Sequence, residues 1–244
     1  MNQFKRFFVL LAVSYAMLFL YSDGTLASES EKLPTTRLRA DINSQELSDR
    51  ILKAYDKIKD LSVNVHFNFK LIKAGLDFDA TGEYFYKQPD RTTLALHGFM
   101  ASRVAQQEEA IRATNILAAL RKNITQEYDA GIVTQMTLEG QPCYTVELTP
   151  KTKENVSRII IWINSDKYTM PQVIMQYSDG SRLLQRKQYT LLDNVYVVQE
   201  METDYVSPKE ELQLYATFGK YLINKVIPDS TFEDRPPSNL ISPF

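Results

Sequence analysis

The chain has 244 residues, with 28 basic and 30 acidic side chains and a net charge of −2. A chain this evenly charged has no basic stripe, which excludes the usual class of nucleic-acid-binding proteins. Cys143 is the only cysteine, so the chain has no internal disulfide bond, and we expect this thiol to be a small buried hydrophobe.

Residues 1–27 predict a secretory signal peptide. Lys5 and Arg6 precede an apolar run over residues 7–21, and Thr25-Leu26-Ala27 supplies small residues for a cleavage site. The run is short for a membrane span. An uncleaved anchor on the outer face of the inner membrane is the alternative. Export to the periplasm is the expectation.

The next segment predicts a leader followed by a helix. Residues 28–42 are polar and are expected to be flexible. Asn43 is a helix N-cap residue with Glu46 three positions later, the spacing of a capping box. One apolar stripe then recurs at helical spacing; its members are Leu47, Ile51, Tyr55 and Ile58.

After Asp60 the hydrophobic period changes from 3.6 to 2, which predicts half-buried antiparallel strands. We expect three of them, over residues 61–71, 78–86 and 92–97. The large inward-facing side chains of the first two are Phe67, Phe69, Phe78, Tyr84 and Tyr86.

Residues 104–124 favour a second helix because they are rich in helix-forming residues. About six further strands follow, with turn signals at Asp179-Gly180 and Asp193-Asn194. The strand at 159–163 is apolar on both faces and carries Trp162. Residues 233–244 are expected to form a loosely ordered tail.

These elements predict one domain over residues 43–232, of the α+β class but mainly β. Its architecture is an open, curved antiparallel sheet, a half-barrel, with the helices packed in its concave face as a lid. The aromatic side chains, Trp162 included, then either line an apolar cavity or form an ordinary core. Periodicity does not separate the two interpretations.

The chain has no motif for catalysis, metal binding or a cofactor. His66 and His97 are the only histidines, and neither has a second ligand at metal spacing. No nucleophile turn and no phosphate-binding glycine loop is present. Asp77, Asp79 and Glu83 predict a solvated outer strand face. An enzyme is therefore the least expected class.

Several stretches resemble the carriers that ferry lipoproteins across the periplasm, the LolA type, and the lipoprotein-sorting-like proteins around them. The resemblance spans roughly residues 44–232. It rests on GEYFYKQP at 82–89, YTVELTPK at 144–151, IIIWIN at 159–164, MPQVIMQYSDGSRLLQRKQYTLL at 170–192 and IPDSTF at 227–232.

The resemblance implies an unclosed β-barrel with a helical lid over an apolar cavity that holds an acyl chain. The implied ligand is an acylated lipoprotein or a lipid, with a membrane-bound donor or acceptor protein as partner. No catalytic residue, metal or cofactor is implied. The alternative is a sensor or interaction domain of the same fold that acts with an envelope-stress or membrane regulator.

The same resemblance assigns roles at the rim of the barrel. Gly82 would allow a close approach of backbone or lid, and Pro89 would end strand pairing. Carriers have an arginine, which engages the lid, where this chain has Gln88. Arg91, three residues later, is a second basic candidate. This difference and the expected helix at 104–124 favour a divergent relative.

We predict cleavage after Ala27, because the Thr25-Leu26-Ala27 site follows a short apolar run. Mass spectrometry of the exported protein should find Ser28 as its first residue. An intact Met1 would instead establish the membrane anchor.

Overall fold

The computed structural model describes residues 38–89, 91–97, 128–152 and 156–232. These residues form one α-helix, α2 (Ser44–Tyr55), one short 3-10 helix, η2 (Asp229–Thr231), and twelve strands. The strands are β1 (Leu38–Arg39), β2 (Asp60–Leu71), β3 (Leu76–Lys87), β4 (Arg91–His97), β5 (Tyr128–Ala130), β6 (Thr134–Leu138), β7 (Gln141–Pro150), β8 (Val156–Asn164), β9 (Gln172–Tyr177), β10 (Arg182–Leu192), β11 (Val195–Val206) and β12 (Glu211–Ile223).

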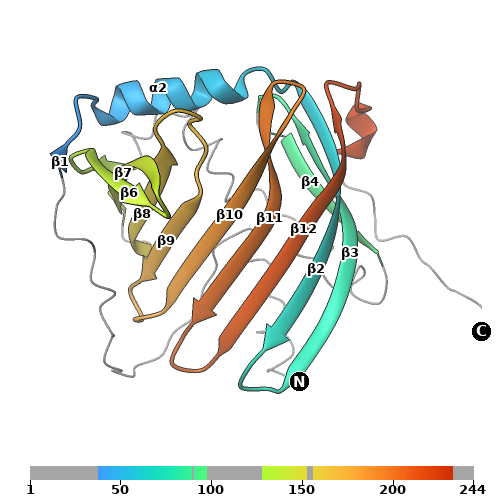
Figure 1. Ribbon diagram of the computed structural model, residues 1–244. Helices are drawn as coiled ribbons and strands as arrows, with labels where there is room; N and C mark the ends of the chain where they lie inside the picture. Colours follow the sequence, from blue (N-terminus) through green and yellow to red (C-terminus); the bar gives the residue numbers. More distant parts are fainter. Residues whose placement is uncertain (1–37, 90, 98–127, 153–155, 233–244) are drawn as a thin grey trace, which may run out of the picture.

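The strands form a single antiparallel sheet in the order β1-β6-β7-β8-β9-β10-β11-β12-β2-β3-β4, and β5 pairs with β7. Figure 1 shows that the sheet is strongly curved and that α2 lies across one end of it. Within the described residues β4 pairs only with β3, so the sheet does not close into a barrel. The predicted open, curved sheet with a helix on it is confirmed.

Cross-strand partners define the two faces of the sheet, because residues directly opposite each other in antiparallel strands point to the same side. One row of such partners crosses eight strands, from β7 to β3. We call the side of this row the inner face and the opposite side the outer face. The row is Val146, Ile161, Val173, Gln185, Thr203, Leu214, Phe69 and Phe78.

The inner face carries two clusters of buried hydrophobic residues. One is built on β2, β3, β11 and β12 and includes Phe67 and Phe69. The other is built on β7, β8 and β9 and includes Leu47 and Ile51 of α2. Tyr55, the last residue of the helix, packs against both clusters. The helix therefore joins the two halves of the inner face.

The start of α2 has the predicted cap. Asn43 has extended backbone, and its side-chain Oδ1 accepts a hydrogen bond from the Glu46 backbone N–H at 2.9 Å. This bond satisfies one of the four N–H groups that a helix leaves without a partner at its first turn. The Glu46 carboxylate pairs with Arg50, one turn later, at 2.6 Å.

The structure differs from the sequence-based expectation at the leader and in the number of strands. The segment expected to be a flexible leader ends in β1, which pairs with β6, and its Ala40 and Ile42 are buried. The predicted nine strands become twelve, in part because β1 and β5 are too short to show alternation. The helix expected at 104–124 lies outside the described residues.

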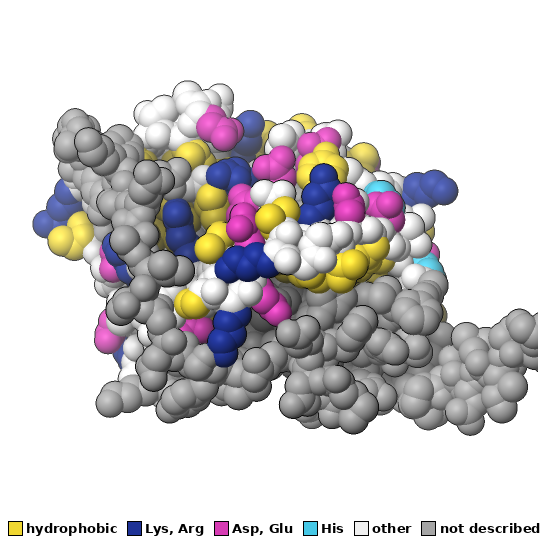
Figure 2. Space-filling model, turned by 90° about the horizontal axis from the view of Figure 1, so that it is seen from below, with side chains coloured by type: hydrophobic (Ala, Val, Ile, Leu, Met, Phe, Trp, Pro, Cys, Tyr) yellow, Lys and Arg dark blue, Asp and Glu magenta, His cyan; other side chains and the backbone are white. Residues whose placement is uncertain are grey.

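Figure 2 shows the molecule from below; on the described part of this face, acidic, basic and hydrophobic side chains are interspersed. Cys143 is fully buried on β7, and burial raises the pKa of its thiol. No helix among the described residues is long and apolar enough to cross a membrane.

Gly82 is a position where the fold admits no side chain. A Cβ atom there would lie 2.7 Å from the Ala95 carbonyl oxygen and 2.9 Å from Leu96 Cδ2, both on β4. The close approach that the sequence suggested is thus to the backbone of the neighbouring strand.

Gly82→Ala should therefore destabilise the protein by about 1–3 kcal/mol, because β3 and β4 must move apart. Urea unfolding followed by circular dichroism measures this change. Gly219→Ala is the matched control, since Gly219 is also in a strand and a Cβ atom added there would have no neighbour within 4 Å. Equal stability of the two variants would contradict the argument.

Candidate functional site

Five of the six predicted cavity residues lie together on the inner face. Phe69 is directly opposite Phe78, and the two rings stack with centroids 5.1 Å apart. Phe67 lies beside Phe69, with ring centroids 5.7 Å apart. Tyr84 and Tyr86 follow along β3 and belong to the same cluster. Burial raises the pKa of Tyr84, as expected for a phenol in apolar surroundings.

Trp162, the sixth predicted cavity residue, lies on the outer face. Its direct partners are Thr145 on β7 and Gln172 on β9. Its indole N–H donates to Met136 Sδ at 3.2 Å, and it packs with Cys143, away from α2. The sequence placed it inside because β8 is apolar on both faces, and such a run does not reveal which side a residue occupies.

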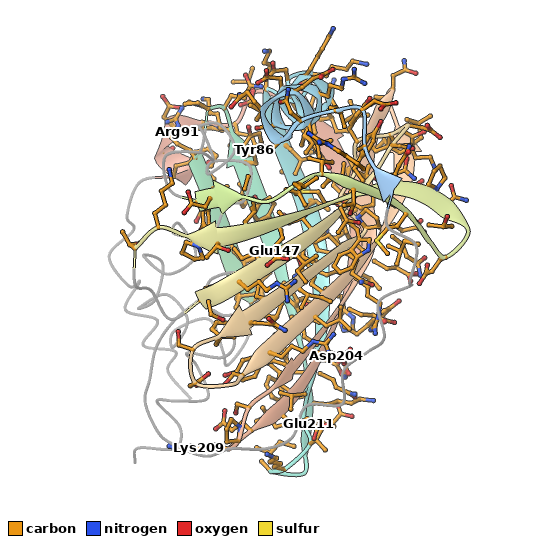
Figure 3. All side chains as sticks on the ribbon, turned by 90° about the vertical axis from the view of Figure 1, so that its left-hand side faces the viewer. Tyr86, Arg91, Glu147, Asp204, Lys209 and Glu211 are labelled. Carbon is orange, nitrogen blue, oxygen red and sulfur yellow. The ribbon has the colours of Figure 1, made fainter. Side chains whose placement is uncertain are left out.

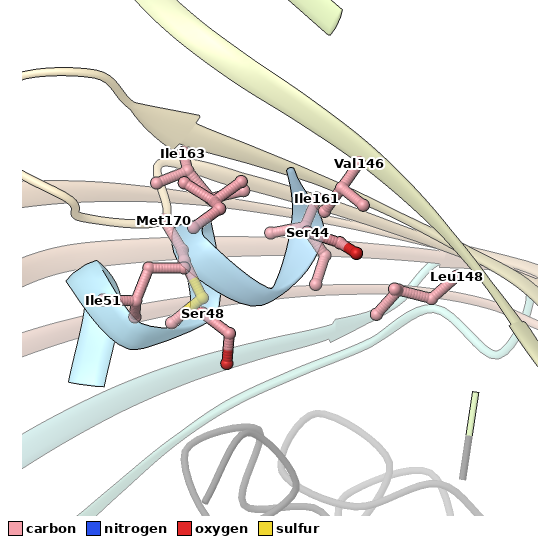
Figure 4. A pocket seen from close by; sticks show the side chains of 9 residues that line it. Ser44, Ser48, Ile51, Val146, Leu148, Ile161, Ile163 and Met170 are labelled. Atoms are coloured by element: carbon pink, nitrogen blue, oxygen red, sulfur yellow. The ribbon is translucent and has the colours of Figure 1, made fainter. Parts of the chain in front are cut away.

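A pocket lies between α2 and the inner face (Figure 4). It is lined by apolar side chains and two serines: Ser44, Leu47, Ser48, Ile51, Val146, Leu148, Ile161, Ile163 and Met170. Its volume is about 20 Å³, enough for about one water molecule. The helix therefore packs closely on this part of the sheet, and an acyl chain does not fit beneath it in this arrangement.

Polar contacts fix the C-terminal end of α2 to the sheet. Gln88 Nε2 donates to the Asp56 carbonyl at 3.2 Å, and Gln88 Oε1 accepts from Lys59 Nζ at 3.2 Å. Asn224 Nδ2 donates to the Lys57 carbonyl at 2.9 Å. Gln88 thus contacts the residue that follows the end of the helix.

One long-range contact fixes the other side of the helix. Arg50 Nη1 donates to the Tyr168 hydroxyl at 2.9 Å. Tyr168 lies between β8 and β9, and its backbone is in the left-handed region at φ 54°. Hydrogen bonds from Arg50 to Tyr168 and then Glu46 raise the pKa of the guanidinium. We call Gln88 and Arg50 the two helix anchors.

Arg91 contacts the C-terminal turn and not the helix. Its Nη2 lies 3.0 Å from Asp229 Oδ1, and its guanidinium carbon lies 5.3 Å from the centre of the Phe232 ring. Lys87 Nζ binds the same carboxylate at 2.6 Å. Bonds from Lys87 and Arg91 lower the pKa of Asp229. Figure 3 shows Arg91 and Tyr86 at the end of the sheet near α2.

Sequence reasoning missed two features of the inner face. Tyr55 of α2 meets Tyr189 of β10 beneath the helix; burial raises the Tyr55 pKa to about 12, and a hydrogen bond with Tyr189 opposes the rise. Lys187 of β10 also faces inward. The pair Arg186-Lys187 gave no signal, because two adjacent charges do not show which one points outward.

The described residues contain no cluster of metal-binding side chains. No group of three or more His, Cys, Asp or Glu side chains among them could hold a metal ion. His66 pairs with Asp79 across the outer face at 3.4 Å, and Asn68 donates to both Asp77 and Asp79. The outer strand face that we expected to be solvated is thus a network of exposed polar contacts.

Known proteins identify the fold of this chain through similar solved structures. A family model described as "Uncharacterized protein" matches residues 117–236, just under half of the chain. No curated protein matches. Among solved structures, a DUF1329 family protein from Desulfovibrio piger superposes with a TM-score of 0.57 at 14% identity, covering 78% of this chain and 95% of that one.

Two further structures agree with it. A LolA superfamily protein from Nitrosomonas europaea has a TM-score of 0.56 at 10% identity, covering 79% of this chain and 98% of that one. An outer membrane lipoprotein-sorting protein domain from Vibrio parahaemolyticus has a TM-score of 0.57 at 11% identity, covering 77% and 95%. The resemblance seen in the sequence is therefore confirmed as a shared fold: this chain has the open-sheet fold of LolA superfamily and lipoprotein-sorting proteins.

Proposed function

We propose that the protein is an extracytoplasmic binding protein that holds the acyl chains of lipoproteins or lipids against its inner face. The observation that carries the proposal is the amphipathic helix α2, which bridges two apolar clusters on one face of an unclosed sheet. In this proposal the protein is a carrier in envelope lipoprotein sorting, with membrane-bound proteins as donor and acceptor. The shared fold supports this role.

The arrangement described above is the closed state of such a protein. Because the pocket under α2 holds only about one water molecule, an acyl chain enters only when the helix moves away from the sheet. The helix is the element to move, because its contacts with the rim are few and polar, whereas the strands are held by continuous ladders.

The energies are compatible with this exchange. Re-exposing Leu47 and Ile51 costs roughly 1.5–3 kcal/mol for each side chain. Burying an acyl chain of about sixteen carbons gains on the order of 10 kcal/mol gross, at about 0.8 kcal/mol for each methylene group. The ligand therefore offsets the loss of the helix contacts, and no catalytic residue is needed.

The test is binding of a polarity-sensitive fluorescent fatty acid to the mature protein. The dye should bind at micromolar protein concentration and should be displaced by an acylated peptide but not by the same peptide without its acyl chain. Failure of the dye to bind would leave the inner face as an ordinary core.

Arg50→Ala should open the helix more often, because it removes the bond to Tyr168. An exposed contact of this kind contributes at most about 1 kcal/mol, so dye uptake in stopped-flow mixing should become about two- to five-fold faster. The control is Gln45→Ala, whose side chain bonds to Asp49 of the same helix. If both variants take up dye at the same rate, the Arg50 contact does not restrain the helix.

Gln88→Ala should have a similar effect at the other anchor. It removes the bond to the Asp56 carbonyl and the acceptor for Lys59, so dye uptake should again rise about two- to five-fold. Gln213→Ala serves as control because Gln213 is exposed on β12. An unchanged rate for Gln88→Ala would show that the rim contact does not govern opening, whatever Arg50→Ala does.

A further inference from the structure

Lys187 is a lysine on the inner face of the sheet. It lies directly opposite Met201 of β11. The row continues across the sheet, because Met201 pairs with Ala216 of β12 and Ala216 pairs with Phe67 of β2. Met201, Ala216 and Phe67 are 4%, 0% and 2% exposed. By strand alternation Lys187 also shares a face with the buried Gln185. The row that leads to Phe67 therefore begins with a cation.

The ammonium group of Lys187 has no acceptor among the described residues. Its neighbour Arg186 points to the outer face and pairs there with Asp204 at 3.0 Å and Glu202 at 3.8 Å. On the inner face nearby, Gln185 Nε2 donates to Thr203 Oγ1 at 3.3 Å. Burial lowers the pKa of Lys187 to about 8, which is the effect of desolvation without a compensating anion.

A partly buried cation with no counter-charge weakens the fold unless something else offsets its desolvation. An anion bound beside the ammonium group would do so with a charge-assisted hydrogen bond. From Lys187 the row crosses three strand spacings to Phe67, a distance of roughly 14 Å. Because the row is buried in the closed state, a ligand reaches it only in the open state of the proposed function. Its length then suits an extended acyl chain of medium size, with its head at β10 and its tail at the aromatic side chains of β2.

We propose that Lys187 binds the anionic head, a carboxylate or a phosphate, of the acyl ligand whose chain lies along this row of the inner face. The inference rests on the proposed function and adds the charge and the orientation of the ligand. A lysine that only extends its amine to water would give no preference for an anionic head.

The experiment compares ligands that share a chain and differ in the head: laurate, lauryl phosphate and lauryl alcohol. Each displaces the fluorescent fatty acid from the full mature protein, and the displacement gives its affinity. Wild type should bind at least one of the two anions about 10- to 100-fold more tightly than the alcohol, the range expected for a hydrogen bond to a charged group. Which anion binds more tightly separates a fatty acid from a phospholipid source.

Lys187→Met should bind the alcohol as wild type does and lose the preference for anions, because methionine keeps most of the chain length without the charge. Lys187→Arg should retain the preference. Lys70→Met is the control for net charge, because Lys70 is on the outer face of β2, 3.9 Å from Asp77. Alcohol binding by each variant also shows that it is folded.

The outcomes separate the two proposals. If wild type binds the alcohol and the anions equally, or if Lys187→Met keeps the preference, the head-binding role is wrong while acyl binding stands. If no ligand of the set binds and the dye does not bind either, the proposed function fails and this inference fails with it.

Discussion

The pairing of β12 with β2 is the constraint on which the rest of the structure depends. It joins strands from the two ends of the described chain, from Leu212 opposite Leu71 to Ile223 opposite Leu61. Without it the sheet would separate into two parts, β2-β3-β4 and the other nine strands. Because α2 directly precedes β2, the same pairing carries the helix to the sheet and lays it against β7, β8 and β9. A contact between residues so far apart in sequence also has a high entropic cost, so we expect folding to be slow.

The inner face owes its character to this arrangement. Strands from both ends of the chain contribute to the row that crosses eight strands, so no single segment supplies the inner face, and α2 bridges its two apolar clusters. The helix covers one part of this surface with a few leucine and isoleucine contacts and is fixed at its edges by side-chain hydrogen bonds. The strand ladders thus form the frame of the domain, and in the proposed function the helix laid on this frame is the part that moves.

Much of this could be predicted from the sequence, for physical reasons that differ between elements. Strict alternation fixed the faces of Phe67, Phe69 and Phe78, because a period of two leaves one choice once the buried side is known. Trp162 was placed on the wrong face because its strand is apolar on both faces over residues 159–163. Arg91 was expected at the lid, but its side chain contacts Asp229 of η2. A basic residue close in sequence to the rim can still point to another element. The inward direction of Lys187 depends on the register of β10 with β11, which no local pattern contains.

Cys143 has a consequence for a protein that is exported, as its N-terminal sequence predicts. A chain with one cysteine can form a disulfide bond only with another molecule, and a reactive thiol in an oxidising compartment would do so. Here the thiol is fully buried and its pKa is raised, so it offers neither access nor thiolate. The folded protein has no disulfide bond and no accessible thiol. It therefore needs no oxidoreductase to form disulfide bonds, and thiol reductants do not weaken it. The thiol is open to oxidation only before folding is complete, while β6, β8 and β9 have yet to pack around it.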